Sequence, residues 1–572
     1  MSTRLLLPLL IILSVPVLQA QDKPRPPARE FKPETRQAAD VLPALQLPEY
    51  VITGSDMISF TEDRKSDLPW PQRPEFTARA GRALREQRFF GTAPTRMPLR
   101  KAALPGSAET FRLKAGAGTW STPHIQAWYA DRFQLGDLAS HVLYERSEGH
   151  VPRSDYSLFA FDIAGGTYLP REMSPLLSSS RLQGAFHARS KRYGLYANRL
   201  DRAPPALDFR RDLVSMDWEA DIISRRNRVL DHSLSVFFRH TGVDEQLAVL
   251  DTMDLQDYSA LENRIGLDGT ARTNIHGYEI DVTGGIHVND LSEAAEGSTR
   301  PYYLHIGAET EYRFDEQTSL DVRARIYSYR GSDHASQFRL YPTALLRYRL
   351  TDAWALHGGY APEVRERSLT GFLRLNPYMM LASTIRHSDL PLRFVAGASF
   401  DNRQRTSARI TASYASSQSW ARFSLLPDPV RQQWELRYDG SSTVLDLQGD
   451  FAHAFSDRTR LQGMALFRTS HNDVVDGDIP YLPSYEVRVL LQHDFPFDLR
   501  LQSTLQLKGE QNSKEGEALP AWLLLGLELE YRVTQNVAAF LRFDNLLDQS
   551  YENWDDYRER PFFMMGGVVI RL

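Results

Sequence analysis

Side chains that could hold a metal ion or bind a nucleotide are the first feature of the sequence to consider. The stretch HNDVVDGDIP carries Asp473, Asp476 and Asp478, but their spacing does not fit the EF-hand calcium loop. Asn and Asp also favour turns, so a structural turn is the stronger interpretation. The glycines of KAGAGTW, Gly116 and Gly118, are not followed by the helix that a nucleotide-binding loop requires. We therefore predict no metal site and no cofactor.

The sequence also contains no motif that is typical of a catalytic site. The 15 histidines are scattered, without an H-E-x-x-H or Ser-His-Asp arrangement. The chain has no cysteine, which excludes a disulfide, a thiolate metal site and a cysteine nucleophile. The net charge of -5 is spread along the chain, which argues against a nucleic-acid-binding face. We expect no catalytic residue and a protein that is not an enzyme.

The elements that would position a binding site are β-strands, because apolar and polar residues alternate from about residue 111 onward. In TSLDVRARIYSY, Val322 and Ile326 fall on one face of a strand, while Asp321 and Arg325 fall on the other. LRLQSTLQLK and YLHIGAETEYRF alternate in the same way. A sandwich with one charged face would show this pattern too, so alternation alone leaves the architecture open.

The spacing of short polar turns favours one architecture over the other. Most of them recur after about 37 to 39 residues, which is enough for two strands of about 10 to 14 residues and a longer loop at the far end. The turns are FDEQT from Phe314, LTDAW from Leu350, HSDLP from His387, LPDPV from Leu426, FSDRT from Phe455, FPFDL from Phe495 and VTQNV from Val533. Strands of this length exceed those of most sandwiches. We predict an all-β fold, a transmembrane antiparallel β-barrel of the outer-membrane type with about 22 strands (22 to 24).

The N-terminal fifth of the chain has a different texture. Residues 1–20 are typical of a signal peptide, with Arg4 before an apolar run that is short for a membrane anchor, the alternative interpretation. Residues 21–110 are rich in proline, which favours an extended periplasmic segment. Residues 111–572 then form the barrel. This division predicts a protein that is exported from the cytoplasm.

One island of the N-terminal segment is rich in arginine. In ARAGRALREQRFF, Arg79, Arg82, Arg85 and Arg88 recur at every third position and would form a basic stripe on a helix. Such a helix could lie in the lumen of the barrel against inward-facing acidic residues. A solvated charged turn is the alternative interpretation.

The end of the chain resembles the C-terminus of TonB-dependent outer-membrane receptors. In that family an N-L-[LF]-D-x-x-Y element precedes a closing strand with an aromatic terminal residue. The residues that carry this resemblance are Asn545, Leu546, Leu547, Asp548 and Tyr551, followed by the apolar register of Phe562, Val568, Ile570 and Leu572. Leu572 departs from the terminal aromatic of the family. The resemblance implies outer-membrane lipid and the barrel-assembly machinery as partners.

LPEYVITGS is similar to the TonB box of the same family, a short segment that pairs with a TonB-type periplasmic protein. The matching residues are Leu47, Pro48, Glu49, Tyr50, Val51, Ile52, Thr53 and Gly54. Pro48 keeps the preceding residue extended, and Tyr50, Val51 and Ile52 favour a strand that a partner can complete. An unremarkable extended stretch of the linker is the alternative. The interval from Gly54 to Phe111 is too short and too rich in proline for a complete plug domain, which predicts a reduced or absent plug.

The sequence therefore predicts a receptor-like barrel in the outer membrane of a Gram-negative bacterium that transports a small solute of unknown identity. A passive porin-like channel and a structural or accessory barrel that acts with a partner protein remain as alternatives. Residues 242–260, 290–301, 471–482 and 545–560 are expected to be the longest loops. They show no signature of a particular ligand.

Overall fold

The computed structural model describes residues 110–572. The residues left out of this range are 134–135, 171–176, 178–179, 198–207, 225–229, 249–257, 276–277, 294–296, 403–404, 427–431 and 514–516. Every described residue belongs to one compact unit, Ser59–Leu572.

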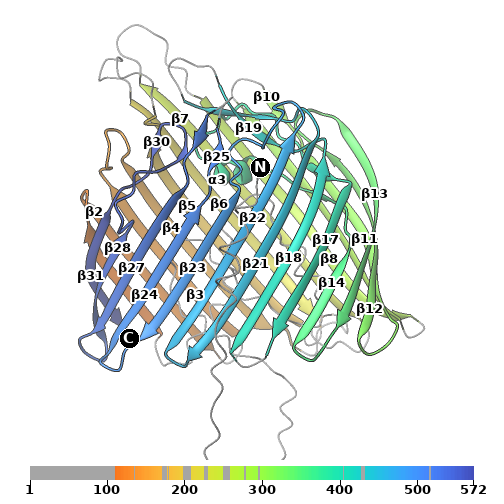
Figure 1. Ribbon diagram of the computed structural model, residues 1–572, viewed down its shortest axis with the longest axis horizontal. Coiled ribbons are helices and arrows are strands. Elements are labelled where there is room, and N and C mark those ends of the chain that lie inside the picture. Colours follow the sequence, from red (N-terminus) through yellow and green to blue (C-terminus); the bar gives the residue numbers. More distant parts are fainter. Residues whose placement is uncertain are drawn as a thin grey trace, which may run out of the picture. The chain divides into compact units, whose positions relative to one another are not determined.

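A closed antiparallel β-barrel accounts for most of the described residues (Figure 1). The main sheet has 23 strands, but the three-residue β10 (Gly297–Thr299) pairs with β9 directly ahead of β11 and continues that strand, so 22 strands form the ring. They are β1 (Phe111–Gly118), β2 (Thr122–Phe133), β3 (Gly136–Ser147), β4 (Tyr156–Tyr168), β5 (Ser180–Gly194), β6 (Asp208–Ser224), β7 (Asp231–Ala248), β8 (Tyr258–Ile275), β9 (Tyr278–Glu293), β11 (Tyr302–Arg313), β12 (Thr318–Arg330), β13 (Ser336–Arg349), β14 (Trp354–Tyr360), β17 (Leu392–Asp401), β18 (Thr406–Ser417), β21 (Ser442–Ser456), β22 (Thr459–Asn472), β23 (Tyr485–Asp494), β24 (Leu499–Lys508), β27 (Trp522–Arg532), β28 (Val537–Asp544) and β31 (Phe563–Arg571). The ring closes where β1 pairs with β31, with Leu113 opposite Ile570. The predicted fold class and strand number are confirmed.

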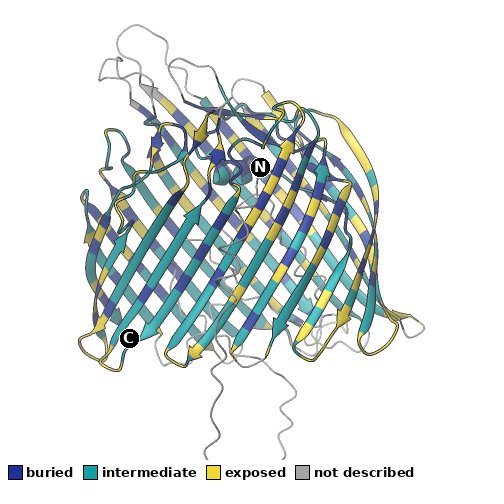
Figure 2. Cartoon of the chain, in the orientation of Figure 1, coloured by how far each residue is buried: buried dark blue, intermediate teal, exposed yellow. Residues whose placement is uncertain are grey.

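The two faces of each strand differ as the alternation predicted. On β12, Val322 and Ile326 are exposed on the outside, whereas Asp321 and Tyr327 are buried on the inside. Buried and exposed stretches alternate along the strands of the barrel (Figure 2). On β31, Val568 is exposed and Val569 is fully buried. Each strand thus turns an apolar face outward, as a barrel in lipid requires.

Aromatic side chains ring the outer face near both ends of the strands. The exposed set at the end with short turns includes Phe133, Tyr168, Tyr278, Tyr312, Phe314, Tyr348, Trp354, Phe455, Phe497 and Tyr531. The set at the other end includes Tyr144, Phe159, Phe338, Phe394 and Phe467. Such girdles mark the two membrane–water interfaces of a transmembrane barrel.

Short turns and long connections lie at opposite ends, here called the turn end and the loop end. Five predicted turns lie at the turn end: FDEQT, LTDAW, FSDRT, FPFDL and VTQNV. The prediction for HSDLP is wrong, because His387 lies in the connection between β14 and β17 at the loop end, and LPDPV begins at Leu426 in the connection between β18 and β21. Both sequences are rich in residues that favour turns, but Ser388–Leu390 of HSDLP forms the short strand β16 instead.

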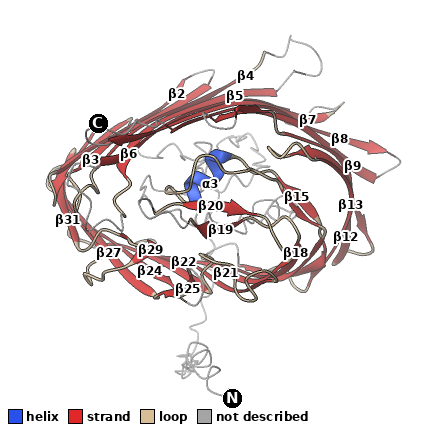
Figure 3. Ribbon diagram, turned by 90° about the horizontal axis from the view of Figure 1, so that it is seen from above, coloured by secondary structure: helices blue, strands red, loops and turns tan. Residues whose placement is uncertain are grey.

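The loop end contains short elements of its own, which lie inside the ring in the view from above (Figure 3). They are the helix α3 (Leu369–Leu375) and the two-stranded pairs β15 (Glu363–Arg365) with β16 (Ser388–Leu390), β19 (Arg422–Leu425) with β20 (Trp434–Arg437), β25 (Gln511–Asn512) with β26 (Ala518–Leu519), and β29 (Glu552–Trp554) with β30 (Tyr557–Arg558). Among the described residues, no helix is long and apolar enough to cross a membrane.

The expectation about the longest loops is wrong. The longest connections span residues 361–391 and 418–441, between β14 and β17 and between β18 and β21. These connections were not recognised as loops because they contain apolar residues that are buried: Leu369, Phe372, Trp434 and Leu436. In sequence, such stretches resemble further strands rather than solvated loops.

Candidate functional site

The folded connections at the loop end form the candidate functional site. We call residues 361–391 together with the described part of 418–441 the cap. Many of its buried side chains, among them Leu369, Phe372 and Trp434, lie in one hydrophobic cluster with the inward-facing Val243, Ala260 and Leu291 of the barrel wall. The cap is therefore packed against the inside of the barrel and is not a solvated surface loop.

Aromatic rings hold the cap to the other connections of the loop end. Trp434 is fully buried, and its ring lies 5.7 Å from that of Tyr481 and 5.1 Å from that of Trp554, measured between centroids. Tyr378 stacks on Tyr557 at 3.5 Å. These rings come from four separate connections, so one aromatic core holds these connections together at the loop end.

The start of α3 is attached to β8 by one buried carboxylate. Glu262, 2% exposed, accepts hydrogen bonds from the backbone N–H groups of Leu369 at 2.9 Å and Thr370 at 3.0 Å. It also accepts from the Thr370 hydroxyl at 2.6 Å and from the side-chain amide of Asn289 at 2.8 Å. Ser368 caps the helix by accepting from the N–H of Gly371 at 3.1 Å. Glu262 thus satisfies donors that a short helix otherwise leaves unpaired.

The segment that follows α3 is attached to β5, β6 and β7. Arg211 of β6 has no exposed surface, and it donates to the carbonyl oxygen of Pro377 at 2.5 Å and to Glu245 of β7 at 2.6 Å. The hydroxyl of Tyr193 donates to the same carbonyl at 2.8 Å. Gln433 adds a hydrogen bond to Glu245 at 2.9 Å. One buried ion pair therefore fixes both long connections of the cap to the barrel.

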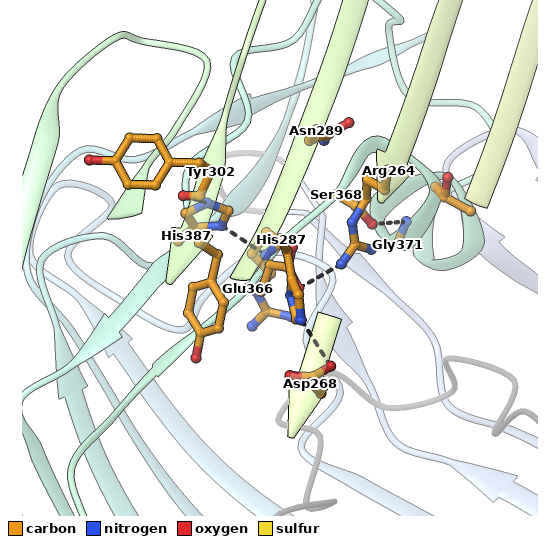
Figure 4. A network of polar contacts seen from close by, with 12 residues as sticks. Arg264, Asp268, His287, Asn289, Tyr302, Glu366, Ser368, Gly371 and His387 are labelled. Atoms are coloured by element: carbon orange, nitrogen blue, oxygen red, sulfur yellow. Dashed lines mark hydrogen bonds and ion pairs between the residues drawn. The ribbon is translucent and has the colours of Figure 1, made fainter. Parts of the chain in front are cut away.

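A polar network centred on Glu366 of the cap contacts β8 and β9 (Figure 4). Its carboxylate lies 2.6 Å from Arg264 and 2.8 Å from His287, whose other ring nitrogen lies 3.0 Å from Asp268. Burial by itself would raise the pKa of Glu366, but the charge of Arg264 and the hydrogen bond of His287 outweigh it and lower that pKa to about 2. Glu366 is therefore ionised at neutral pH and binds β8 and β9 together.

His387 forms a neighbouring contact of the same network. Its Nδ1 accepts from the N–H of Arg367 at 3.1 Å, which leaves the proton on Nε2, 3.3 Å from the carbonyl oxygen of Tyr302. Burial lowers the pKa of His387, so the neutral ring fits this pattern.

The β15–β16 pair rests on tyrosines of β11, β12 and β13. Tyr303, Tyr327 and Tyr341 are buried in one cluster with Val364. The Tyr303 hydroxyl donates to the carbonyl oxygen of Val364 at 3.1 Å, and Asp389 accepts from Tyr341 and, at 2.7 Å, from Arg339. The cap is thus attached to β6, β7, β8, β9, β11 and β13, and it can occlude the lumen at the loop end.

The aspartate-rich stretch predicted as a structural turn follows β22. Asn472 is fully buried and accepts hydrogen bonds from the N–H groups of Val474 at 3.1 Å and Val475 at 3.3 Å. Asp473 lies 3.5 Å from His471, and Asp478 accepts from Ser470 at 3.3 Å. Throughout the described residues, no group of three or more His, Cys, Asp or Glu side chains is arranged to hold a metal ion.

The residues of the C-terminal resemblance form the turn that follows β28 and then the last strand. Asn545 accepts from the N–H of Gln549 at 3.0 Å, and Asp548 accepts from the N–H of Phe562 at 2.9 Å. Leu547 is exposed, and the ring of Tyr551 packs 4.9 Å from that of Trp522. The element thus lies after β28 rather than on it, where it sets the course of the connection into β31.

Two predicted sites lie outside the described residues. They are the TonB-box-like run, Leu47 to Gly54, and the basic stripe of Arg79, Arg82, Arg85 and Arg88. Conversely, sequence reasoning did not find Glu262, Arg211 or Glu366 as anchors of the cap. Glu262 and Arg211 contact cap residues that lie more than a hundred positions away in the sequence, so no local pattern marks these two side chains.

Comparisons with known proteins bear on the fold. No protein-family model matches the sequence, and no curated protein matches it. The pyoverdine outer-membrane receptor FpvA from Pseudomonas aeruginosa PAO1 is similar with a TM-score of 0.60 at 10% identity, over 81% of this chain and 78% of that one. The siderophore receptor PiuA from Acinetobacter baumannii is similar with a TM-score of 0.61 at 10% identity, over 82% of this chain and 82% of that one. The copper transporter OprC is similar with a TM-score of 0.59 at 13% identity, over 81% of this chain and 80% of that one.

These structures are TonB-dependent receptors with a 22-strand barrel. The likeness extends over most of the described chain, although few residues are identical. The chain therefore has the 22-strand barrel fold of the TonB-dependent outer-membrane receptors.

Proposed function

We propose that this protein is a transporter of the outer membrane that carries a small solute and is coupled to a TonB-type periplasmic protein. The observation that supports it best is the cap: a passive channel needs an open lumen, whereas here two long connections fold into the loop end and are fixed there by buried charges. We infer that a lumen occluded by the cap passes its solute only with an input of energy.

The sidedness of the barrel agrees with this proposal. Outer-membrane barrels keep short turns in the periplasm and longer loops outside the cell. The cap then faces the exterior. Thr110, whose N–H donates to the carbonyl oxygen of Leu572 at 2.8 Å, lies at the turn end, so the chain enters the barrel from the periplasm. Residues 21–110 would be the periplasmic segment, and LPEYVITGS would add a strand to the partner by β-augmentation.

The receptor-like structures of the comparison are named for siderophores, pyoverdine and copper. We infer that the cargo of this chain is likewise a small solute, and that its role is transport rather than catalysis.

Binding of the periplasmic partner is the direct test. The purified full chain is titrated with the periplasmic domain of a TonB-type protein from the same source, and Val51→Pro is expected to abolish binding because proline removes a backbone donor from the added strand. Asp63→Pro, outside the box, is the control. Single-channel recording of the same wild-type protein should show a closed barrel. No binding together with a large, steady conductance would overturn the coupled transporter in favour of the porin-like channel.

A further inference from the structure

The seam between β1 and β31 joins two strands that lie at opposite ends of the described chain. The other neighbours in the ring follow one another along the chain, so their connections restrict how they pair. At the seam the paired residues are mostly small, with Gly116 opposite Gly567 and Ala117 opposite Gly566. Because strands rich in glycine specify their register only weakly, further contacts must select the register in which the ring closes.

Two ion pairs reach across this seam from β27 to β1. The carboxylate of Glu530 lies 3.0 Å from Arg112, and that of Glu528 lies 3.0 Å from Lys114. In the ring, β28 and β31 lie between β27 and β1, so each ion pair spans two intervening strands. Glu530 and Lys114 are buried, and breaking a buried ion pair is strongly destabilising.

Glu530 also bridges a pair of like charges within the seam. Arg112 of β1 stands directly opposite Arg571 of β31, and like charges in opposite positions destabilise a pair of strands. Both guanidinium groups donate to Glu530, one to each oxygen of its carboxylate. In the observed register the carboxylate therefore connects two arginines that would otherwise repel each other.

Phe540 of β28 covers the glycines of the seam. A Cβ atom added to Gly116 would lie 2.7 Å from Cζ of Phe540, and one added to Gly567 would lie 2.7 Å from its Cε1. One ring thus lies over a glycine from each side of the seam. The Nζ of Lys114 lies 4.3 Å from the centroid of this ring, so the cation is held beside its aromatic face.

A slip of the seam by two residues would break these contacts. Such a slip keeps each side chain on its own face of the sheet, but it moves β1 by about 7 Å along β31. Arg112 and Lys114 would then leave Glu530 and Glu528, and Gly116 would leave the ring of Phe540. The observed register is therefore the one in which all of these contacts form together.

We propose that Glu528, Glu530 and Phe540 select the register in which the ring closes. We call their contacts with β1 the register contacts. They also align the loop end, where His150 lies 2.8 Å from the carbonyl oxygen of Arg558 across the seam. Because register and stagger are linked in a barrel, a slipped ring would separate this pair. The inference is independent of the proposed transport function.

Cysteine cross-linking of the full chain tests the register contacts, because the sequence contains no cysteine of its own. Leu113→Cys with Ile570→Cys reports the observed register, in which these two residues are opposite. Leu113→Cys with Val568→Cys, or with Leu572→Cys, reports a slip by two residues in either direction. Cα atoms of such diagonal neighbours lie about 7 to 8 Å apart in the observed register, which is too far for a disulfide. Mobility of the denatured, unreduced chain after mild oxidation gives the cross-linked fraction.

In the otherwise unchanged chain we expect the disulfide of the observed register to predominate. Glu530→Gln combined with Phe540→Ala should raise the slipped fraction at least about tenfold, because a charge-assisted contact and the packing over the glycines are both lost. Glu309→Gln is the matched control. Glu309 is also an inward-facing glutamate, 2.7 Å from Arg323 on the neighbouring strand, but a tight turn connects its two strands. Its slipped fraction should stay unchanged.

A slipped fraction in Glu530→Gln with Phe540→Ala that equals the unchanged chain would overturn the proposal, as would an equal rise in Glu309→Gln. Should the double variant fail to close, Phe540→Leu and Arg112→Gln each remove one contact and leave Glu530 paired with Arg571. Each should raise the slipped fraction by less than the double variant. The absence of a rise in both would also overturn the proposal.

Discussion

Replacing Glu262 by alanine should release the cap while leaving the barrel closed. The carboxylate accepts from the backbone N–H groups of Leu369 and Thr370 and from the amide of Asn289, and all of these contacts lie within 3.0 Å. Each hydrogen bond to a charged group contributes about 1.5 to 3 kcal/mol, and each buried donor left unpaired costs about 1 to 3 kcal/mol. Because these contributions are not additive, we take about 3 to 4 kcal/mol as the loss for the substitution.

This loss translates into a measurable opening of the cap. About 1.4 kcal/mol corresponds to a tenfold change in an equilibrium constant, so the open state should be about a hundredfold to a thousandfold more populated. Hydrogen exchange of peptides from residues 361–391 reports this population directly, because amides exchange through local opening. Peptides from β12 and β13 should keep their protection, since the barrel ladders are unchanged.

Glu311→Ala provides the control, because Glu311 forms an exposed pair with Arg313 at the turn end, where such pairs contribute about 0 to 1 kcal/mol. Unchanged protection of residues 361–391 in Glu262→Ala, with the barrel intact, would refute the view that buried polar contacts hold the cap.

Three further perturbations follow from the same contacts. Because the pKa of Glu366 is lowered from 4.5 to about 2, its stabilisation of the cap is complete above about pH 4.5 and is lost as the pH falls towards 2. Hydrogen exchange of residues 361–391 should therefore show a loss of protection between pH 6 and pH 3. The variant Glu366→Gln should not show this loss. Arg211→Met leaves a buried carboxylate without its cation and should destabilise the cap by about 3 to 5 kcal/mol, measured as a lower midpoint of urea-induced exposure of Trp fluorescence. Gly567→Ala places a Cβ 2.1 Å from a carbonyl oxygen of β1 and should impair closure of the ring, measured by electrophoretic mobility of unheated samples, whereas Gly184→Ala meets its nearest neighbour at 3.5 Å and should fold normally.

Each of these outcomes can fail in a defined way. Equal pH profiles for wild type and Glu366→Gln would place the acid-sensitive contact elsewhere. A stable Arg211→Met would mean that packing alone retains the cap. Normal folding of Gly567→Ala would show that the seam between β1 and β31 can shift to admit a methyl group.

The faces of the strands were predictable because they depend on neighbouring residues. The period of two that separates Val322 and Ile326 from Asp321 and Arg325 is a local property of an extended chain. In a barrel every strand has one face towards lipid, so this pattern, together with the spacing of the turns and the length of the strands, predicted the class of fold. The turns FDEQT and VTQNV were found for the same reason: the residues that shape them are adjacent.

Tertiary structure alone decided where the long connections go. HSDLP and LPDPV have turn-forming residues like the others, but the destination of residues 361–391 depends on Glu262 and Arg211, whose contacts join parts of the chain more than a hundred residues apart. Glu366 likewise reaches Arg264 and His287 only because the β14–β17 connection brings it to the wall that carries them. Alternation and the spacing of the turns thus predict a barrel, whereas the packing of the cap inside it requires contacts between distant segments that no local pattern records.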